Sequence, residues 1–337
     1  MRMIDFHSHY YPPKYLRALE SGQTSVRVTI DADGNPNIHY PGDYNVAVLG
    51  HRDLAYRQGV LENIEAAHQA AMMQVLTLTT PGTHVETRDR AVHLASLVND
   101  ELKEAVEARG RYFTALATLP LNDPAASITE LRRAVSQLGM RGAMLFSNVN
   151  GVALSDRRFW PMYEVADELH AVLYIHPAPP VGVEAMLEYW LMPLCGFLFD
   201  TTLAAASLVF SGVVERFPRV RWALCHLGGT IPYLAERLDR GFHAFKECRA
   251  NIDREPSRYL KQFYYDTVNF NQGALKLAID FAGADRILAG SDYPHKIGSI
   301  PSMLDAIAEL PVTDAERAGI LGANAARLLG LSEAREF

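Results

Sequence analysis

Two histidines near the N-terminus, His7 and His9, are the residues best suited to do chemistry. They lie in the segment 3–10, where apolar and polar residues alternate as in a short β-strand. Side chains two residues apart on a strand point to the same face, so Asp5, His7 and His9 are expected to line one side. Imidazole is the commonest protein ligand of metal ions. The spacing therefore predicts either a metal-binding pair or two ordinary histidines at a strand end.

Polar side chains of the same kinds end other apolar runs. One run ends in His176, another in His226, and a third is followed by Asp292. Three neutral imidazoles and a carboxylate suit Zn²⁺, and also Mn²⁺, Fe²⁺ or Co²⁺. A fourth histidine is then free for acid–base work, because an imidazole titrates near neutral pH. The eight other histidines fall in predicted loops or helices, where solvated or structural roles are the default; His295, close behind Asp292, fits that default least securely.

The elements that must position these residues alternate along the chain. Strands are predicted at about 3–9, 73–79, 112–119, 141–147, 171–177, 220–226, 263–268 and 286–291. Helical patterns lie between them at 88–109, 124–138, 157–169 and 231–247. Short, almost continuously apolar runs are typical of strands buried on both faces. The order predicts an α/β protein with the (β/α)₈ TIM barrel fold, whose active site lies at the C-terminal ends of the strands.

An open doubly wound sheet is the alternative fold. Its dinucleotide-binding form carries a Gly-rich loop after the first strand, where this chain has Tyr10-Tyr11-Pro12-Pro13. The interval after the first strand is the longest, and its residues 23–48 predict an inserted β-hairpin with Asp33-Gly34 at the turn. An insertion at this place in a barrel is expected to cover the site mouth. We interpret 1–337 as a single domain.

Composition excludes several classes of function. The chain has 337 residues, 49% of them apolar and 21% charged, with a net charge of -7 and no block rich in Lys and Arg. This balance does not favour nucleic acid or an anionic membrane as a partner. Three cysteines without a C-x-x-C pair fit a reducing cytoplasm, and we expect no export signal. The most apolar stretch, Cys195 to Val214, contains Asp200 and predicts a buried helix rather than a membrane span.

Motifs along nearly the whole chain resemble the amidohydrolase superfamily. More narrowly, they resemble its amidohydrolase-related branch, which contains aminocarboxymuconate-semialdehyde decarboxylase. The motifs are Asp5-Phe6-His7-Ser8-His9, Leu119-Pro120-Leu121-Asn122-Asp123, His176-Pro177, His226-Leu227-Gly228-Gly229, Phe263-Tyr264-Tyr265-Asp266, Gly273-Ala274-Leu275, Gly290-Ser291-Asp292-Tyr293-Pro294 and Gly322-Ala323-Asn324-Ala325. Each motif alone is weak evidence for the family, but all of them in this order are specific to it.

The resemblance implies a (β/α)₈ barrel with one divalent metal, most often Zn²⁺, with Mn²⁺ also possible. The family's metal ligands correspond to His7, His9, His176 and Asp292, and its catalytic histidine corresponds to His226. Relatives with two metals hold a lysine at the end of strand four, where this chain has Phe146-Ser147-Asn148, so a mononuclear site is favoured. Related resorcylate-type decarboxylases often have Glu-x-Ala in place of the first pair, whereas this chain keeps His-x-His.

The resemblance also implies where the substrate binds. The semialdehyde decarboxylase holds its substrate's carboxylates with two arginines; Arg52 corresponds to the first, but Phe245-Lys246 stands at the second. Lysine lacks the planar fork of arginine, so the substrate is expected to carry one carboxylate or an aromatic ring against Phe245. Trp190, in the long segment after strand five, is expected either in the substrate pocket or at a dimer contact.

The function expected from these residues is non-oxidative decarboxylation of a small unsaturated or aromatic carboxylic acid. The proton that replaces the carboxylate could come from His226, from Asp292 or from a water activated by the metal. The alternative is a metal-dependent hydrolase or hydratase acting on a lactone, amide or unsaturated dicarboxylate with the same residues. A homodimer is expected, because the family commonly dimerises and the segment 186–214 is unusually apolar.

Overall fold

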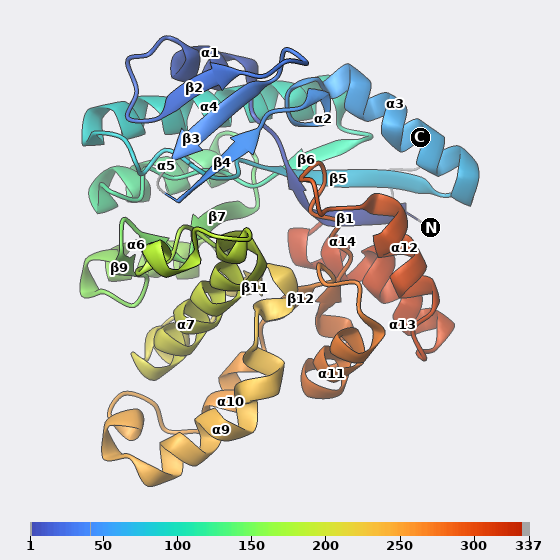
Figure 1. The fold of residues 1–337 in the computed structure, drawn as a ribbon. Helices are drawn as coiled ribbons and strands as arrows, with labels where there is room; N and C mark the ends of the chain where they lie inside the picture. Colours follow the sequence, from blue (N-terminus) through green and yellow to red (C-terminus); the bar gives the residue numbers. More distant parts are fainter. Residues whose placement is uncertain (1, 41, 332–337) are drawn as a thin grey trace.

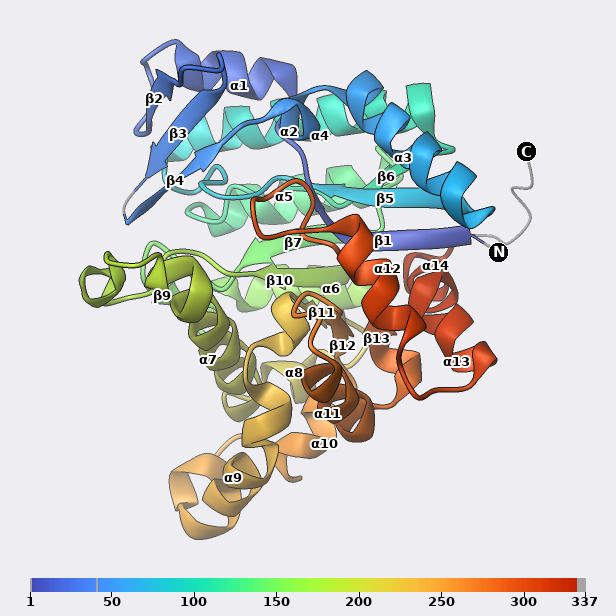
Figure 2. The same cartoon turned by 45° about the vertical axis from the view of Figure 1, so that its right-hand side comes forward.

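The computed structural model of the protein describes residues 2–40 and 42–331. Residues 1 and 332–337 of the predicted domain, and residue 41 of the predicted hairpin, lie outside this part. Among the described residues, parallel strands lie in the middle of the molecule with helices around them (Figure 1). Figure 2, turned by 45°, shows the same arrangement from a second direction.

Eight parallel strands form two sheets among the described residues. One has the order β1-β5-β6 and the other the order β13-β12-β11-β10-β7. Their bounds are β1 Arg2–His9, β5 Ala71–Thr77, β6 Phe113–Ala115, β7 Gly142–Phe146, β10 Val172–His176, β11 Arg221–Leu224, β12 Tyr264–Asp266 and β13 Ile287–Leu288. Each overlaps one of the eight predicted strands.

Backbone contacts link the two sheets at both joins. Beyond β6, Ala117 donates from its N–H to the carbonyl of Gly142 on β7 at 3.0 Å. At the other join, Phe6 of β1 donates to Ala289 at 2.7 Å, and Asp292 donates to the carbonyl of His7 at 2.9 Å. These bonds continue the sheets where β6 and β13 are shorter than the sequence predicted, and they bring the ends of β1 and β13 together.

The longer helices pack on the outside of the strands. They are α1 Pro13–Glu20, α3 Leu54–His68, α4 Arg88–Arg109, α5 Pro124–Ser136, α6 Trp160–Glu168, α7 Phe197–Phe210, α9 Ile231–Ala244, α11 Gln272–Ala282 and α12 Ile300–Ala308. Shorter helices are α2 Leu49–Arg52, α8 Val213–Arg216, α10 Pro256–Leu260, α13 Asp314–Ala318 and α14 Asn324–Leu329. The bounds follow local chemistry: the Asp123 side chain caps α5 by accepting from the N–H of Ala126 at 3.1 Å, and Pro124 suits its first turn.

Two predicted helices differ from the structure at their ends. The region 157–169 divides into a 3₁₀ turn at Arg157–Phe159 and then α6, whose first turn carries a proline. The region 231–247 is α-helical only as far as Ala244, because Phe245 adopts an extended backbone. The first difference arises at Pro161, which has no N–H to bond to the preceding turn, and the second at Phe245, whose backbone does not continue the helix.

An antiparallel sheet follows β1 and α1. Its strands are β2 Arg27–Ile30, β3 Pro36–Tyr40 and β4 Asp43–Val46, in the order β2-β3-β4. The turn between β2 and β3 places Gly34 at a φ of +79°, a conformation that glycine adopts without strain. A smaller antiparallel pair, β8 Asn148–Val149 and β9 Val152–Ala153, follows β7.

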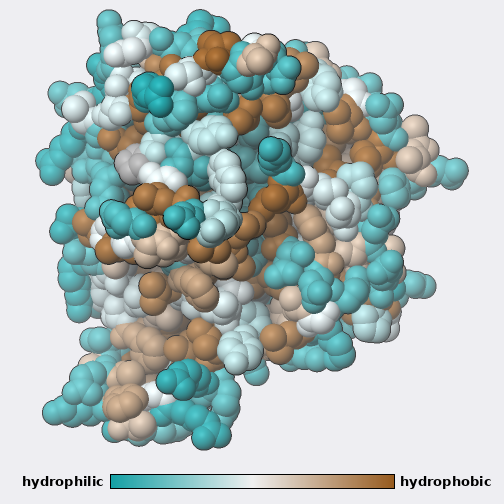
Figure 3. Space-filling view, in the orientation of Figure 1, coloured by the Kyte–Doolittle hydropathy of each residue, from teal (hydrophilic) through white to brown (hydrophobic). Residues whose placement is uncertain are grey.

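Helix α7 is only partly buried, whereas its composition predicted a buried helix. The stretch Met192–Phe210 is long and apolar enough to cross a membrane by length and composition, and half of it is buried inside the protein. Ala205 and Leu208 are buried, but Phe199 and Leu203 are 55% and 67% exposed. Composition could not reveal this, because an apolar helix without polar residues on one side gives no periodic signal of which face lies outside. Figure 3 shows the apolar side chains over α7 on the surface.

Candidate metal and acid–base site

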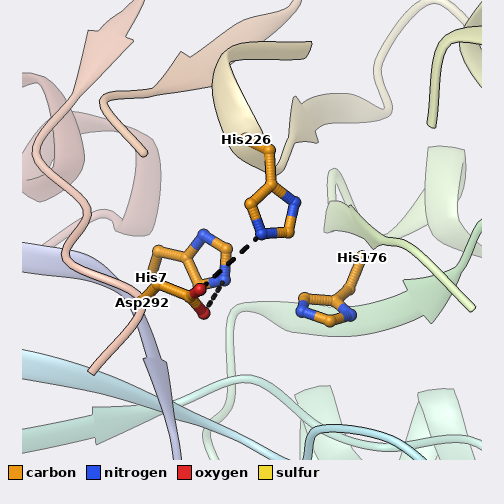
Figure 4. A group of neighbouring side chains, drawn as sticks. All are labelled: His7, His176, His226 and Asp292. Carbon is orange, nitrogen blue, oxygen red and sulfur yellow. Dashed lines mark ion pairs between the residues drawn. The ribbon is translucent and has the colours of Figure 1, made fainter. Parts of the chain in front are cut away.

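Four of the predicted residues lie together at the carboxyl ends of the parallel strands. His7 and His176 belong to β1 and β10, and His226 and Asp292 follow β11 and β13. One nitrogen of each histidine and one oxygen of Asp292 lie within 4.8 Å of one another, and all four residues are buried. Figure 4 shows the Asp292 carboxylate between His7 and His226, with His176 across from them. Their types and spacing could hold a metal ion.

His9 joins the same group. Its Nε2 lies 3.0 Å from Nε2 of His7 and 3.2 Å from Oδ1 of Asp292, and Nε2 of His7 lies 3.3 Å from that same oxygen. The structure therefore brings together His7, His9, His176, His226 and Asp292. Asp5, which we expected on the same face of β1, instead accepts hydrogen bonds from Ser291 and Gln74. The pairing register of β1 shifts between Asp5 and Ser8, which separates Asp5 from the two histidines.

In His7, His9 and His176, the ring nitrogen Nδ1 already has a hydrogen-bond acceptor. Nδ1 of His7 lies 2.6 Å from the carboxylate of Asp266, and Nδ1 of His176 lies 2.8 Å from the carbonyl of Pro177. Nδ1 of His9 lies 3.1 Å from the hydroxyl of Thr77, which itself donates to the carbonyl of Ser8.

These acceptors fix the tautomers. A carboxylate and a carbonyl only accept, and a hydroxyl whose hydrogen is already donated can only accept as well. Each Nδ1 therefore carries the ring's hydrogen, and each neutral ring presents Nε2 as a lone pair. Lone pairs of His7 and His9 face each other beside a carboxylate, which is unfavourable unless a cation or a proton lies between them.

The pKa values of this group follow from burial and from these contacts. Burial lowers the pKa of His9 and of His176 well below the usual value, which keeps both rings neutral. Burial also lowers the pKa of His7, but Cys225 and Asp266 raise it more, and the result lies well above the usual value. Burial raises the pKa of Asp292, but its contacts with His226 and His7 outweigh this and hold that pKa well below the usual range. Asp292 is therefore ionised.

His226 is held differently from the other histidines. Its Nε2 lies 3.8 Å from Oδ2 of Asp292, and its Nδ1 is buried without a hydrogen-bond partner among the described residues. Three residues of the site, His226, Leu227 and Asp292, have φ values of 52°, 56° and 58°. Residues other than glycine rarely adopt this left-handed backbone conformation, and such strain is concentrated at functional sites.

Asp266, the last residue of β12, makes hydrogen bonds that hold several residues of the site in place. Its carboxylate accepts from His7 Nδ1 at 2.6 Å and from the Tyr174 hydroxyl at 2.7 Å. It also accepts from the backbone N–H groups of His226 and Leu227, both at 3.2 Å. Asp266 thus fixes the tautomer of His7 and also supports the strained turn that carries His226.

The neighbouring Gly290 lets this arrangement form. A Cβ added at Gly290 would lie 2.8 Å from the Cβ of His7 and 2.9 Å from the Cβ of Asp266. Real Cβ atoms do not approach so closely, so only glycine allows His7 and Asp266 to meet here.

The sequence reasoning missed several residues of this site. Asp266 is the last residue of β12, but it lies inside the predicted strand 263–268 and therefore lacks the strand-end signal that indicates His176 and His226. Thr77 lies at the end of β5, where a threonine gives no distinctive signal. His295, the histidine that fits the solvated or structural default least securely, has a ring nitrogen within 4.8 Å of a ring nitrogen of His9 and a carboxylate oxygen of Asp292.

The three predicted substrate-binding residues are not part of this group of histidines and Asp292. Arg52 is hydrogen-bonded to other residues, and Phe245 and Trp190 are exposed. Arg52 donates from Nε to the carbonyl of Ala47 at 2.9 Å and from Nη2 to Asn35 at 3.4 Å. Helix α9 lies at the outer edge of the molecule in Figures 1 and 2; Phe245, which follows it, is 61% exposed. Trp190 is 53% exposed, and its ring lies 5.5 Å from that of Tyr44 on β4. Their roles in binding stay predictions.

Comparison with known proteins defines the class. Residues 4–331 match the model of the amidohydrolase family, and the chain belongs to that family, as its motifs predicted. A 2-amino-3-carboxymuconate-6-semialdehyde decarboxylase from Dictyostelium discoideum is 34% identical over 244 residues, which are 72% of this chain and 67% of that protein.

Two further relatives are decarboxylases of an aromatic acid. The gamma-resorcylate decarboxylase of a Rhizobium species is 31% identical over 87% of this chain and 93% of its own length. The crystal structure of 2,6-dihydroxybenzoate decarboxylase, complexed with 2,6-dihydroxybenzoate, superposes with a TM-score of 0.81 at 26% identity and covers 98% of this chain and 100% of that one. Gamma-resorcylate is 2,6-dihydroxybenzoate, so these two proteins act on the same acid; they share decarboxylation with the semialdehyde decarboxylase and differ from it in substrate.

Proposed function

We propose that this protein is a metal-dependent, non-oxidative decarboxylase of a small unsaturated or aromatic carboxylic acid. The observation that carries the proposal is the convergence of imidazole lone pairs and the Asp292 carboxylate beside His226, in a chain whose relatives are decarboxylases. His7, His9, His176 and Asp292 would hold one divalent ion. Nitrogen and oxygen donors of this kind suit Zn²⁺ first and Mn²⁺ second.

The ion, when bound, supplies Lewis-acid stabilisation of negative charge on a substrate oxygen. His226 moves the proton. It delivers a proton to the carbon that bears the carboxylate, the bond from that carbon to the carboxylate then breaks, and its electron pair restores the conjugated system as CO₂ leaves. Solvent returns the proton to His226. The side chain is suited to this task because its Nδ1 has no competing hydrogen-bond partner among the described residues and its Nε2 faces Asp292.

The proposed architecture is a single domain built on a closed (β/α)₈ barrel. The backbone bonds at both joins between the two sheets support closure, and the buried side chains form one connected core. The antiparallel strands β2 to β4 are proposed to cover the mouth of the site, which the contact of Tyr44 with Trp190 supports. Such a cover would keep water from the reacting groups.

We further propose a homodimer in the cytoplasm. Leu194, just before α7, and Phe199 and Leu203 of α7 expose apolar side chains four to five residues apart, and Figure 3 shows apolar atoms over α7. A second copy could cover this surface. The three cysteines are unpaired, which fits a reducing compartment.

A screen for two reactions tests the function. Metal-loaded protein is offered aromatic and muconate-like acids, and CO₂ release is followed beside hydrolysis of a lactone and amide set. The proposal expects CO₂ release from at least one acid and no comparable hydrolysis. Turnover of lactones or amides without CO₂ release would replace it with a hydrolase function.

A further inference from the structure

His7 and His176 make different contacts at Nδ1, the ring nitrogen that does not face the proposed metal. His7 donates from Nδ1 to the carboxylate of Asp266, whereas His176 donates to a neutral backbone carbonyl, that of Pro177, at 2.8 Å. Hydrogen bonds to an ionised acceptor are about twice as strong as those to a neutral one. His176, which lies across from His7 in Figure 4, therefore has no direct support from a negative charge at Nδ1.

A buried carboxylate lies beyond the Pro177 carbonyl. The N–H of Ala178 belongs to the same peptide group as this carbonyl, and it donates to Oγ of Ser147, just after β7, at 2.9 Å. The Ser147 hydroxyl in turn donates to Oδ2 of Asp200, in the first turn of α7. Ser147 and Asp200 are 3% and 8% exposed. An unbroken hydrogen-bond relay thus joins the Asp200 carboxylate to the ring of His176.

The direction of the bonds in this relay is fixed. A peptide N–H only donates, so the Ser147 oxygen accepts from Ala178 and its own hydrogen goes to Asp200. The side-chain NH₂ of Asn148 also donates to Oδ2 of Asp200, at 2.8 Å. Burial raises the pKa of Asp200, and the hydrogen bonds from Ser147 and Asn148 lower it in part. Two donors on one oxygen suit an ionised carboxylate, and no cation pairs with Asp200 among the described residues.

Hydrogen bonds that follow one another in this way strengthen one another. A hydroxyl that donates to an anion becomes a better acceptor for the N–H of Ala178. An accepted N–H shifts the electrons of the conjugated peptide group toward its carbonyl oxygen. The Pro177 carbonyl then accepts more strongly from Nδ1 of His176, and Nε2 of that ring becomes a more basic lone pair. A neutral side chain at position 200 would fill the same space without supplying the charge.

We propose that Asp200 is a positioning residue of the metal site, whose negative charge acts on His176 through the Ser147 hydroxyl and the peptide group that His176 contacts. The inference rests on the proposed function, because it takes His176 as a metal ligand. In this role Asp200 touches neither the metal nor the substrate. It does for His176, through two intervening groups, what Asp266 does for His7 directly.

A double-mutant cycle tests the relay. Asp200→Asn keeps the shape and an oxygen that can accept from Ser147 and Asn148, but it removes the charge. Ser147→Ala interrupts the relay. The Zn²⁺ affinities of the wild type, both single variants and the double variant are measured by competition with a chromophoric chelator. Asp167→Asn is the matched control, because Asp167 is a helical aspartate that is also 8% exposed but bonds to Arg219, outside the site.

Asp200→Asn is expected to lower the Zn²⁺ affinity by about tenfold, the lower end of the loss for a partner that orients a metal-binding histidine, and Ser147→Ala by at least as much. When Ser147 is already Ala, Asp200→Asn should change the affinity less than about twofold, because the charge no longer reaches His176. Asp167→Asn should keep the wild-type affinity. Wild-type affinity in Asp200→Asn overturns the proposal. An equal loss from Asp200→Asn with and without Ser147 also overturns it, because the charge then acts without the relay.

The Co²⁺ form of the protein gives a second measurement, which decides alone if Ser147→Ala does not fold. Its visible absorption depends on the donor strength and geometry of the ligands, so the bands should shift in Asp200→Asn and stay in Asp167→Asn. Identical spectra in the wild type and Asp200→Asn overturn the proposal. Protein that binds metal but releases no CO₂ refutes the proposed function alone, whereas CO₂ release with unaltered metal affinity in Asp200→Asn refutes this inference alone.

Discussion

Replacing Asp266 by Asn is expected to weaken metal binding although Asp266 is not among the proposed metal ligands. The carboxylate accepts from His7 Nδ1 and from the Tyr174 hydroxyl with one oxygen, and from the N–H groups of Leu227 and Val268 with the other. An amide has only one acceptor atom. Its NH₂ group must face either the two backbone N–H groups or the ring of His7.

Both orientations are unfavourable. Toward the backbone, the NH₂ group meets two donors. Toward His7, it meets Nδ1 and favours the tautomer with the hydrogen on Nε2, the nitrogen that the proposed metal needs as a lone pair. Loss of a partner that orients a metal-binding histidine costs about 10- to 100-fold in metal affinity, which corresponds to about 1.4–2.8 kcal/mol.

Competition with a chromophoric chelator measures this affinity directly. At a fixed free metal concentration, the stabilisation of the protein by metal in thermal unfolding should fall by a matching amount. Asp5→Asn is the matched control, because Asp5 is an equally buried aspartate that contacts Ser291 and Gln74 but none of the histidines. Wild-type affinity in Asp266→Asn, or an equal loss in Asp5→Asn, would refute the reasoning.

Further outcomes are expected from other changes. His226→Ala should keep its metal and lose about 10²–10⁴ in kcat, whereas His176→Ala should lose metal in elemental analysis; a metal-free His226→Ala would make His226 a ligand. Light scattering at micromolar concentration should give the mass of a dimer, and a monomer mass would contradict the role given to α7. Burial lowers the pKa of His84 to about 4, below the unfolded value of about 6.5. The unfolded chain therefore binds more protons between these values, and stability falls as pH drops through that window. By pH 5 this group has lowered the free energy of unfolding by about 2 kcal/mol. Chemical denaturation should therefore show that acidification lowers the free energy of unfolding less in His84→Phe than in the wild type. An equal decrease in both proteins would contradict this role of His84.

The strand ends of the site could be predicted because the information is local. A buried strand reads as a short apolar run, and the polar residue that ends it, such as His176, must lie at the edge of the sheet. Asp266 lies inside the predicted strand 263–268, and a lone carboxylate there does not reveal that it will accept a hydrogen bond from His7 on another strand.

The substrate side of the site depends on geometry that local patterns do not contain. Adjacent residues on a helical turn point about 100° apart, so the sequence of α2 cannot say whether His51 or Arg52 faces His295. The structure directs Arg52 to Ala47 and Asn35 and brings His51 to His295. Hydrogen bonds from outside α2 hold it in place: the N–H of Tyr11 donates to the carbonyl of His51 at 2.7 Å, and Arg57 donates to the carbonyl of Gly50 at 3.0 Å.

The most direct test of the central claim is a titration of metal-free protein with Zn²⁺ or Mn²⁺, in which bound metal and CO₂ release are measured on the same sample. Activity is expected to rise in proportion to bound metal and to reach its maximum near one equivalent per chain. A maximum at two equivalents would contradict the mononuclear site. Full CO₂ release from protein that contains no metal would contradict the function proposed for His7, His9, His176 and Asp292.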